Sequence, residues 1–162
     1  MPDHIKIRPI IVTDDAMIAA IIRTSLDEFG AAKPGTVYFD ETTDHLHDVF
    51  KQAGSAYFVA EEENKILGGA GIFPTQGLPG HTCELVKMYL SKEARGKGLG
   101  KILLEKCMSE AKKMGYKKMY LESMPELKTA ISMYNNLGFK NIEKALGNSG
   151  HGGCTVWMIK DL

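Results

Sequence analysis

The hydrophobic positions of the chain follow two periods, one typical of helices and one typical of strands. Apolar side chains recur at helical spacing over residues 14–29 and 99–114, and a glycine follows each run at Gly30 and Gly115. Shorter helices are expected over residues 43–52 and 125–137. Alternating or continuous apolar runs predict strands at residues 5–8, 57–60, 65–73, 82–90, 118–123, 139–144 and 155–160.

The order of these elements predicts the fold class. Strands and helices interleave along the chain, which favours an α+β or α/β protein built on a mixed sheet. The sequence has 162 residues, with no internal repeat and no stretch that is typical of a linker. We therefore expect a single domain over residues 1–162, large enough to bury a hydrophobic core.

The composition of the chain argues against several classes of protein. Hydrophobic residues make up 44% and charged residues 25% of the sequence, the balance of an ordinary globular protein. The three cysteines, Cys83, Cys107 and Cys154, are an odd number at wide spacing, which argues against a disulfide framework. The longest apolar run, residues 16–22, is too short to cross a membrane, and the first residues lack a signal-peptide pattern. We expect a cytoplasmic protein.

Charge is unevenly distributed along the chain. Residues 1–90 hold 7 Lys and Arg against 13 Asp and Glu, and residues 91–162 hold 13 against 7, so the net charge is zero. A neutral chain without aromatic residues between its lysines is a poor candidate for nucleic-acid binding. The basic half suits a polyanionic ligand and the acidic half suits a cationic substrate. The alternative is that both are solvated surfaces.

A glycine-rich turn joins the strand at residues 82–90 to the helix at residues 99–114. Backbone N–H groups at the start of a helix have no partner within the helix, and the helix dipole favours an anion there. Lys101 adds a cation to those within the turn. The glycine spacing fits neither a dinucleotide fingerprint nor a P-loop. We expect the turn to bind a phosphate-bearing cofactor; the alternative is a solvated basic loop. The turn consists of Arg95, Gly96, Lys97, Gly98, Leu99 and Gly100.

A second motif lies further along the chain, where Ala130, Tyr134, Gly138 and Phe139 match A-x-x-x-Y-x-x-x-G-F. With an R-x-x-G-x-G turn directly after an apolar strand, the sequence resembles the GNAT superfamily of acyl-CoA-dependent N-acetyltransferases. The resemblance extends over essentially the whole chain. It implies an α+β fold with α/β/α layers, in which helices flank a mixed, mostly antiparallel sheet of about six or seven strands.

The resemblance also implies a cofactor and the residues that hold it. Acetyl-CoA would be the co-substrate, with no metal, and dimers are common in the family. The main chain of the preceding strand would bind the pantetheine arm through Met88, Tyr89 and Leu90. An N–H group of Met88 or Tyr89 would hold the developing oxyanion. The family often has Asn where this chain has Leu127, so one pantetheine contact is expected to differ. The amides that would bind the pyrophosphate belong to Arg95, Gly96, Lys97, Gly98, Leu99, Gly100 and Lys101.

Acetyl transfer to an amine needs a general base and a proton for the departing thiolate. Glu84 is the first candidate base: it is a lone carboxylate in an apolar strand, and burial would raise its pKa. Alternation along that strand would place Glu84, Val86, Met88 and Leu90 on one face. Glu122, in the strand at residues 118–123, is the second candidate base. Either glutamate could instead be an exposed strand-end charge or an anchor for the substrate amine.

Tyr134 matches the family tyrosine that protonates the thiolate; the alternative is a core aromatic side chain. Residues 147–154 form a glycine-rich loop that contains His151 and Cys154. A similar loop borders the acceptor pocket in some members of the family, and His151 could contact substrate there or assist proton transfer. Zinc held by His81, Cys83, His151 and Cys154 is a further alternative, but this spacing is not a recognised framework.

These observations together predict an acyltransferase that moves an acetyl group from acetyl-CoA to a primary amine, most simply of a small molecule. Direct attack in a ternary complex would suffice, although Cys83 or Cys154 could support an acyl-cysteine route. Three other functions stay open on the sequence alone. They are a non-catalytic acyl-CoA sensor, an acetyltransferase acting on protein N-termini or lysines, and a nucleic-acid binder.

Overall fold

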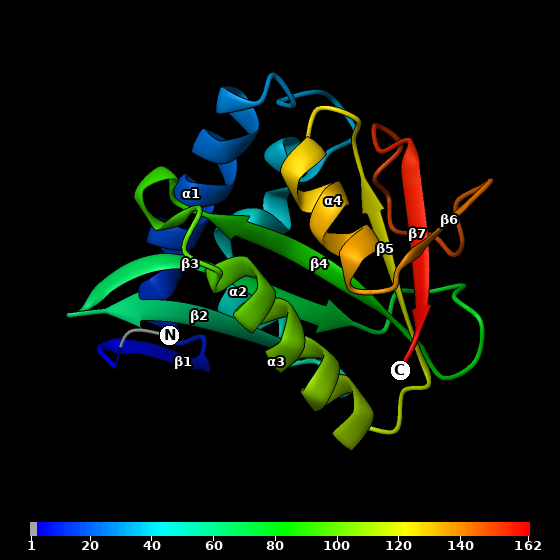
Figure 1. Cartoon of the computed structure of the whole chain (residues 1–162), viewed down its shortest axis with the longest axis horizontal. Helices are drawn as coiled ribbons and strands as arrows, with labels where there is room; N and C mark the ends of the chain where they lie inside the picture. The colour runs from blue at the N-terminus through cyan, green and yellow to red at the C-terminus, as the bar shows by residue number, and fades with distance from the viewer. Residues whose placement is uncertain (1–2) are drawn as a thin grey trace.

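A computed structural model describes residues 3–162, and the chain is built on one seven-stranded sheet (Figure 1). The strands are β1 (Ile5–Pro9), β2 (Ala56–Glu62), β3 (Lys65–Phe73), β4 (Thr82–Leu90), β5 (Lys118–Ser123), β6 (Lys140–Ile142) and β7 (Val156–Asp161). Their order in the sheet is β1-β2-β3-β4-β5-β7-β6. Only β4 and β5 run parallel, and all other neighbours are antiparallel. The mixed, mostly antiparallel sheet predicted from the sequence is confirmed.

Four helices cover the two faces of the sheet, which confirms the α/β/α layers (Figure 1). Their amphipathic faces divide the buried side chains into two clusters. The longer helix on each face carries a continuous stripe of buried apolar residues. The helices are α1 (Asp15–Glu28), α2 (Leu46–Val49), α3 (Leu99–Lys113) and α4 (Lys128–Asn136). None of the helices within residues 3–162 has the length and apolar character needed to cross a bilayer.

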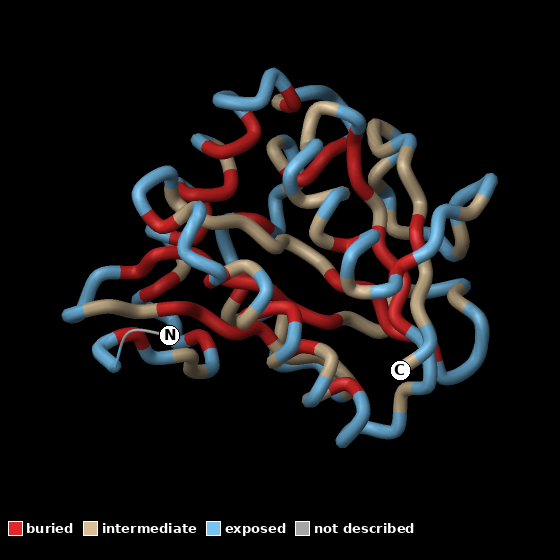
Figure 2. The backbone as a smooth tube through the Cα atoms, viewed as in Figure 1, coloured by how far each residue is buried: buried red, intermediate tan, exposed pale blue. Residues whose placement is uncertain are grey.

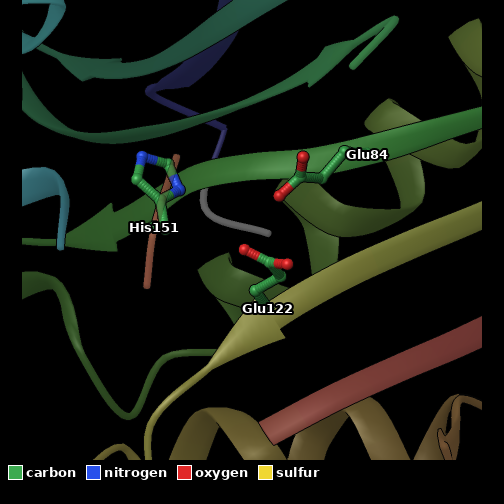
Figure 3. A group of neighbouring side chains, drawn as sticks. All are labelled: Glu84, Glu122 and His151. Atoms are coloured by element: carbon green, nitrogen blue, oxygen red, sulfur yellow. The ribbon is translucent and has the colours of Figure 1, made fainter. Parts of the chain in front are cut away.

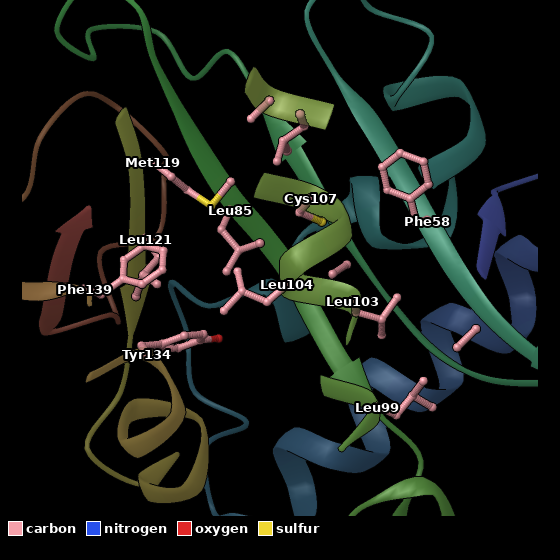
Figure 4. Close-up of a cluster of buried hydrophobic side chains, with 14 of the residues drawn as sticks. Phe58, Leu85, Leu99, Leu103, Leu104, Cys107, Met119, Leu121, Tyr134 and Phe139 are labelled. Carbon is pink, nitrogen blue, oxygen red and sulfur yellow. The ribbon is translucent and has the colours of Figure 1, made fainter. Parts of the chain in front are cut away.

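The first cluster lies between the sheet and helices α3 and α4 (Figure 4). There, Leu103, Leu104 and Cys107 of α3 are fully buried among strand side chains such as Leu85 and Met119. The second cluster lies under α1 and α2 on the other face. Burial extends along the interiors of β2 and β3 and over the first four residues of β4, whereas residues 86–90 of β4 are half-buried (Figure 2).

One bulge in β4 overturns a prediction from the sequence. Val86 pairs with Gly71 and Tyr89 with Gly69, so β4 has one residue more than β3 between these two pairs. Lys87, inside this bulge, has a φ of 50°. Strict alternation, which would have kept Glu84 and Met88 on one face, is therefore wrong. Leu85, Met88 and Leu90 all contact the cluster under α3 and α4, whereas Tyr89 contacts the other cluster.

Two predicted elements are shorter in the structure. The expected helix at residues 43–52 is divided into a 3₁₀ turn, Glu41–Asp44, and the short helix α2, because the chain leaves helical geometry at His45. The expected strand at residues 139–144 is reduced to β6, which pairs only with β7. β6 is the last strand at one edge of the sheet, so it has a pairing partner on one side only.

The sheet divides between β4 and β5. These strands pair at three positions only, Thr82 with Lys118, Cys83 with Met119 and Glu84 with Tyr120. Beyond Glu84 they diverge, and β5 continues alongside β7 (Figure 1). We call the diverging segments, 84–90 of β4 and 120–123 of β5, the fork. The last register pair of β4 with β5 places Glu84 at its apex.

Candidate active site

A cavity of about 40 Å³ lies at the fork. One part of its wall is charged and comes from β4, β5 and the loop before β7. Another part is apolar, with Val37, Met124 and Leu127. Cavities with apolar walls and a few convergent polar groups are typical of small-molecule sites. The charged and polar side chains of the wall include Glu84, Lys87, Glu122, His151 and Cys154.

Glu84 is a buried carboxylate with one hydroxyl partner. Its residue is 2% exposed, and the Thr75 hydroxyl donates to Oε1 at 2.6 Å. Burial raises the pKa of Glu84 to about 7, because desolvation and the nearby carboxylate of Glu122 outweigh the hydrogen bond from Thr75 and the charge of Lys87. A carboxylate whose pKa is near neutrality can both accept and release a proton under physiological conditions.

Glu122 faces the same cavity and has more polar contacts. Tyr120 donates its hydroxyl to Oε2 at 2.6 Å, and the Ser149 hydroxyl donates to Oε1. Each carboxylate oxygen therefore already accepts one hydrogen bond. Ser149 belongs to the loop before β7, so Glu122 also holds that loop against the fork.

The glycine-rich loop at residues 147–154 borders this cavity. His151 and Cys154 both line the cavity wall. One ligand atom each of Glu84, Glu122 and His151 lies within 4.8 Å of the others, and Figure 3 shows the three side chains converging. The zinc arrangement of two histidines and two cysteines does not form, because Cys83 lies in the core cluster on the opposite face of the sheet.

Lys87 belongs to the cavity wall and was missed by sequence reasoning. Lys87 follows Glu84 by three residues, so alternation placed it on the other face, and the bulge brings it back. Its Nζ lies 3.6 Å from Oδ2 of Asp40, which is also 3.3 Å from Nε2 of His151. The sequence signal was present, since Lys87 and Glu84 are the only charged residues within residues 82–90.

Tyr134 lies on the other side of the fork from this cavity. It is 6% exposed and packs against Phe139, and its hydroxyl points toward Sδ of Met88 at 4.0 Å. Burial raises the pKa of Tyr134, so the phenol stays protonated. The structure thus places the predicted acid next to one of the three strand residues predicted to contact the cofactor.

The glycine turn has the geometry of an anion site. Gly96 and Gly98 have φ values of 76° and 78°, a conformation that side-chain-bearing residues adopt at a cost. Within residues 3–162, the first amide of α3 that donates to a turn carbonyl is Ile102, which bonds Gly98. The amides before it point out of the helix N-terminus beside Met88 and Leu90, whose side chains approach Gly100. The turn and the end of β4 are therefore contiguous.

Comparison with known proteins decides the family. The acetyltransferase (GNAT) family model matches residues 18–139. This chain belongs to the GNAT family. It is 41% identical to the uncharacterized N-acetyltransferase YjgM of Escherichia coli K12 over 162 residues, covering 99% of this chain and 97% of that protein.

Solved GNAT structures share the whole fold. The chain superimposes with a TM-score of 0.83 on a GNAT acetyltransferase from Staphylococcus aureus Mu50, at 19% identity, covering 98% of this chain and 99% of the other. With a phosphinothricin acetyltransferase from Sinorhizobium meliloti, solved in complex with acetyl-CoA, the TM-score is 0.75 at 25% identity. That match covers 98% of this chain and 89% of the other. This GNAT protein is an acyltransferase.

Within this GNAT protein, the Arg95 side chain is directed away from the predicted pyrophosphate site. Its guanidinium pairs with Glu28 at 2.7 Å, donates to the Leu90 carbonyl and to the Ser25 hydroxyl, and lies 4.8 Å from the centre of the Phe29 ring. Arg95 thus joins the end of β4 to α1. Lys97 and Lys101 are the more exposed cations of the turn.

Proposed function

We propose that this GNAT protein transfers the acetyl group of acetyl-CoA to a primary amine of a small-molecule acceptor. The amine would bind in the cavity at the fork, and the acetyl thioester would reach it from the α3 and α4 side. The observation that carries this proposal is Glu84. It is a buried carboxylate with a pKa of about 7, located at the apex of the fork and facing the cavity.

The cofactor would bind along the turn and the end of β4. The amides from Arg95 to Lys101 would receive the pyrophosphate, with Lys97 and Lys101 as accompanying cations. The Arg95 amide also donates to the Lys92 carbonyl at 3.4 Å. The main chain of Met88, Tyr89 and Leu90 would pair with the pantetheine arm, because β4 lacks its β5 partner there. The complex of the related phosphinothricin acetyltransferase with acetyl-CoA supports this choice of co-substrate.

The transfer would need no covalent intermediate on the protein. The acceptor ammonium gives a proton to Glu84, and the neutral nitrogen attacks the thioester carbonyl carbon. An N–H group of Met88 or Tyr89 stabilises the resulting oxyanion. The carbon–sulfur bond then breaks, and the CoA thiolate takes the proton of the Tyr134 hydroxyl. The nitrogen releases its second proton to solvent as the amide forms, and the Tyr134 phenolate and Glu84 exchange protons with solvent before the next turnover. Glu122, which already accepts hydrogen bonds from two neutral hydroxyl groups, would orient the amine beside Glu84.

We place this activity in the cytoplasm, because Cys83, Cys107 and Cys154 are all free thiols. A small-molecule acceptor suits the cavity at the fork, because it combines an apolar wall with a few convergent polar groups. A sensor that binds acyl-CoA without turnover has no use for a buried base at the fork.

Calorimetric titration with acetyl-CoA and a thiol-release assay with a panel of amines test the proposal. Gly100 is the position to vary: a Cβ there meets only ordinary contacts with Met88 and Met133. Gly100→Glu should fold and lose acetyl-CoA binding, because its carboxylate repels the pyrophosphate. Ser109→Glu, which adds the same charge on the exposed side of α3, should bind normally. Acetyl-CoA binding without thiol release from any amine would instead favour the sensor.

A further inference from the structure

The cavity holds a positive charge that the proposed chemistry does not use. The Lys87 side chain is 7% exposed, and its ammonium lines the same cavity as Glu84. Asp40 is its ion-pair partner at 3.6 Å, which is longer than a hydrogen bond to a carboxylate. Within residues 3–162, Lys87 Nζ has no acceptor at hydrogen-bond distance. A buried ammonium in this state is costly unless something else pairs with it.

Asp40 has other partners that fix its carboxylate. Its Oδ1 accepts hydrogen bonds from the backbone N–H and the hydroxyl of Thr42, at 2.9 and 2.7 Å. Its Oδ2 lies nearer to His151 than to Lys87. Burial opposes ionisation of Asp40, but these bonds and the charge of Lys87 prevail and hold its pKa at about 2. Asp40 is therefore a shared counter-ion, and the ammonium keeps donors for a second anion.

The backbone of β4 is strained in the way that brings Lys87 into the cavity. Its φ of 50° lies in the left-handed region, which residues other than glycine seldom adopt. Tyr57 donates its hydroxyl to the Lys87 carbonyl at 2.7 Å and so supports this conformation. Strain of this kind persists where the surrounding structure maintains it, and it is concentrated at ligand sites. The bulge is the reason that a lysine and Glu84 share one cavity.

We propose that the acceptor is an amino acid, an amine with a neighbouring carboxylate, and that Lys87 binds this carboxylate while Glu84 receives the proton of the amine. This inference rests on the proposed acetyl transfer and names its substrate class. The acidic side of the cavity, Glu84 and Glu122, faces the ammonium end. The apolar wall of Val37, Met124 and Leu127 receives the side chain of the amino acid.

Pairs of acceptors that differ only in the carboxylate test this inference. L-alanine, L-leucine and L-phenylalanine are each compared with ethylamine, isopentylamine and phenethylamine, in which hydrogen replaces the carboxylate. We expect kcat/KM to be roughly 10- to 100-fold higher for the amino acid in at least one pair, the factor that one charge-assisted hydrogen bond supplies. Equal values in all pairs, or a preference for the plain amines, overturn the inference but leave acetyl transfer standing.

Lys87→Met identifies the residue responsible, since methionine keeps the length of the chain and removes the charge. The preference for the amino acid should collapse toward unity, chiefly through KM. Lys118→Met, at an exposed position on β5 that does not line the cavity, should keep the preference for the amino acid. A preference that survives Lys87→Met in a folded protein overturns the role of Lys87. Failure of every acceptor to release thiol is a different result and refutes the proposed function itself.

A better response to diamines than to amino acids would point to a different substrate class. In that case Asp40, rather than Lys87, would bind the distant charge of the acceptor. Asp40→Asn separates the two: it should abolish a diamine preference, but it should leave an amino-acid preference at least as high, because Lys87 loses a competing anion. Loss of a diamine preference in Asp40→Asn would show that Asp40 binds the distant charge, and a retained amino-acid preference would show that Lys87 does.

Discussion

Glu84 and Glu122 lie on strands that part immediately after Glu84, and yet a carboxylate oxygen of one comes within 4.8 Å of an oxygen of the other (Figure 3). Their surroundings differ. Glu84 is buried and accepts one hydroxyl hydrogen bond, whereas Glu122 accepts two. Two neighbouring carboxyl groups in different environments can divide acid–base work between them. Here the burial of Glu84, in the negative field of Glu122, suits Glu84 for proton transfer.

Glu84→Gln should remove the acidic limb of the pH–rate profile. In the unmodified protein, kcat/KM should rise with pH through about 7, because the carboxylate must be ionised to accept a proton. The variant should lose roughly 100- to 10,000-fold in rate. Glu122→Gln should lose less and keep the limb, moved to lower pH because the charge of Glu122 no longer raises the pKa of Glu84. A limb that survives in Glu84→Gln and disappears in Glu122→Gln would exchange the two roles.

The same substitution should stabilise the folded protein at alkaline pH. The pKa of Glu84 is higher in the folded state than the ordinary 4.5, so folding favours the protonated form, and stability decreases as pH rises from about 4.5 through about 7. At about 1.4 kcal/mol for each pKa unit, the penalty at pH 8 is up to about 3 kcal/mol. Glu84→Gln should not show this loss of stability, because the glutamine side chain does not ionise. Denaturant unfolding at pH 8 and pH 4 measures the gain, which should vanish at pH 4.

Tyr134→Phe should lower turnover far more than acetyl-CoA affinity. The hydroxyl lies against Met88 in the apolar cluster, where its only described polar neighbour is the Met88 sulfur, so little stability is lost with it. We expect a decrease in kcat of about 100-fold or more and an unchanged Kd by calorimetry. Tyr116→Phe, which removes a hydroxyl that donates to the Gly54 carbonyl far from the fork, is the matched control. Equal turnover in Tyr134→Phe and Tyr116→Phe would contradict the acid role and show that Tyr134 serves only as a core residue.

Much of the fold could be predicted from local pattern, and the exceptions have a physical cause. The strands at residues 65–73, 82–90 and 118–123 have the predicted bounds, because each contains successive apolar residues that pack in the core. The bulge at Lys87 could not be predicted. It depends on the pairing with β3 and on the hydroxyl of Tyr57, neither of which leaves a local pattern in β4.

The candidate site was predictable in the same uneven way. Glu84 and Glu122 stand out as carboxylates in apolar strands, and the two motifs stand out by their spacing. Lys87 did not, because its place in the cavity wall depends on the bulge in β4. The role of Arg95 as a link to Glu28 and Phe29 likewise depends on the packing of α1, which sequence spacing does not encode.

Substitutions of Arg95 and Lys97 should therefore have different effects, one on the stability of the fold and the other on acetyl-CoA binding. Arg95→Met removes the ion pair with Glu28 and the hydrogen bonds to Leu90 and Ser25, and should lower the free energy of unfolding by about 1–3 kcal/mol. Lys97→Met, at an exposed position, should leave stability unchanged and weaken acetyl-CoA binding by about fivefold at low salt. Thermal unfolding and calorimetry at two ionic strengths distinguish them. The reverse pattern would place the Arg95 guanidinium on the pyrophosphate.

Acetyl-CoA alone should not acetylate the protein. Cys154 is the cysteine that lines the cavity, and burial raises its pKa to about 12, with Glu122 and Glu84 adding to the effect. A thiol in this environment is almost entirely protonated at pH 7, and the thiolate is the nucleophile. Cys83 faces the other cluster, where burial likewise raises its pKa to about 12.

Mass spectrometry after incubation with acetyl-CoA should therefore show an unchanged mass, and Cys154→Ala should keep most of its turnover. A stable adduct that an amine then discharges, together with an inactive Cys154→Ala, would establish the acyl-cysteine route and make Glu84 the base for that thiol instead.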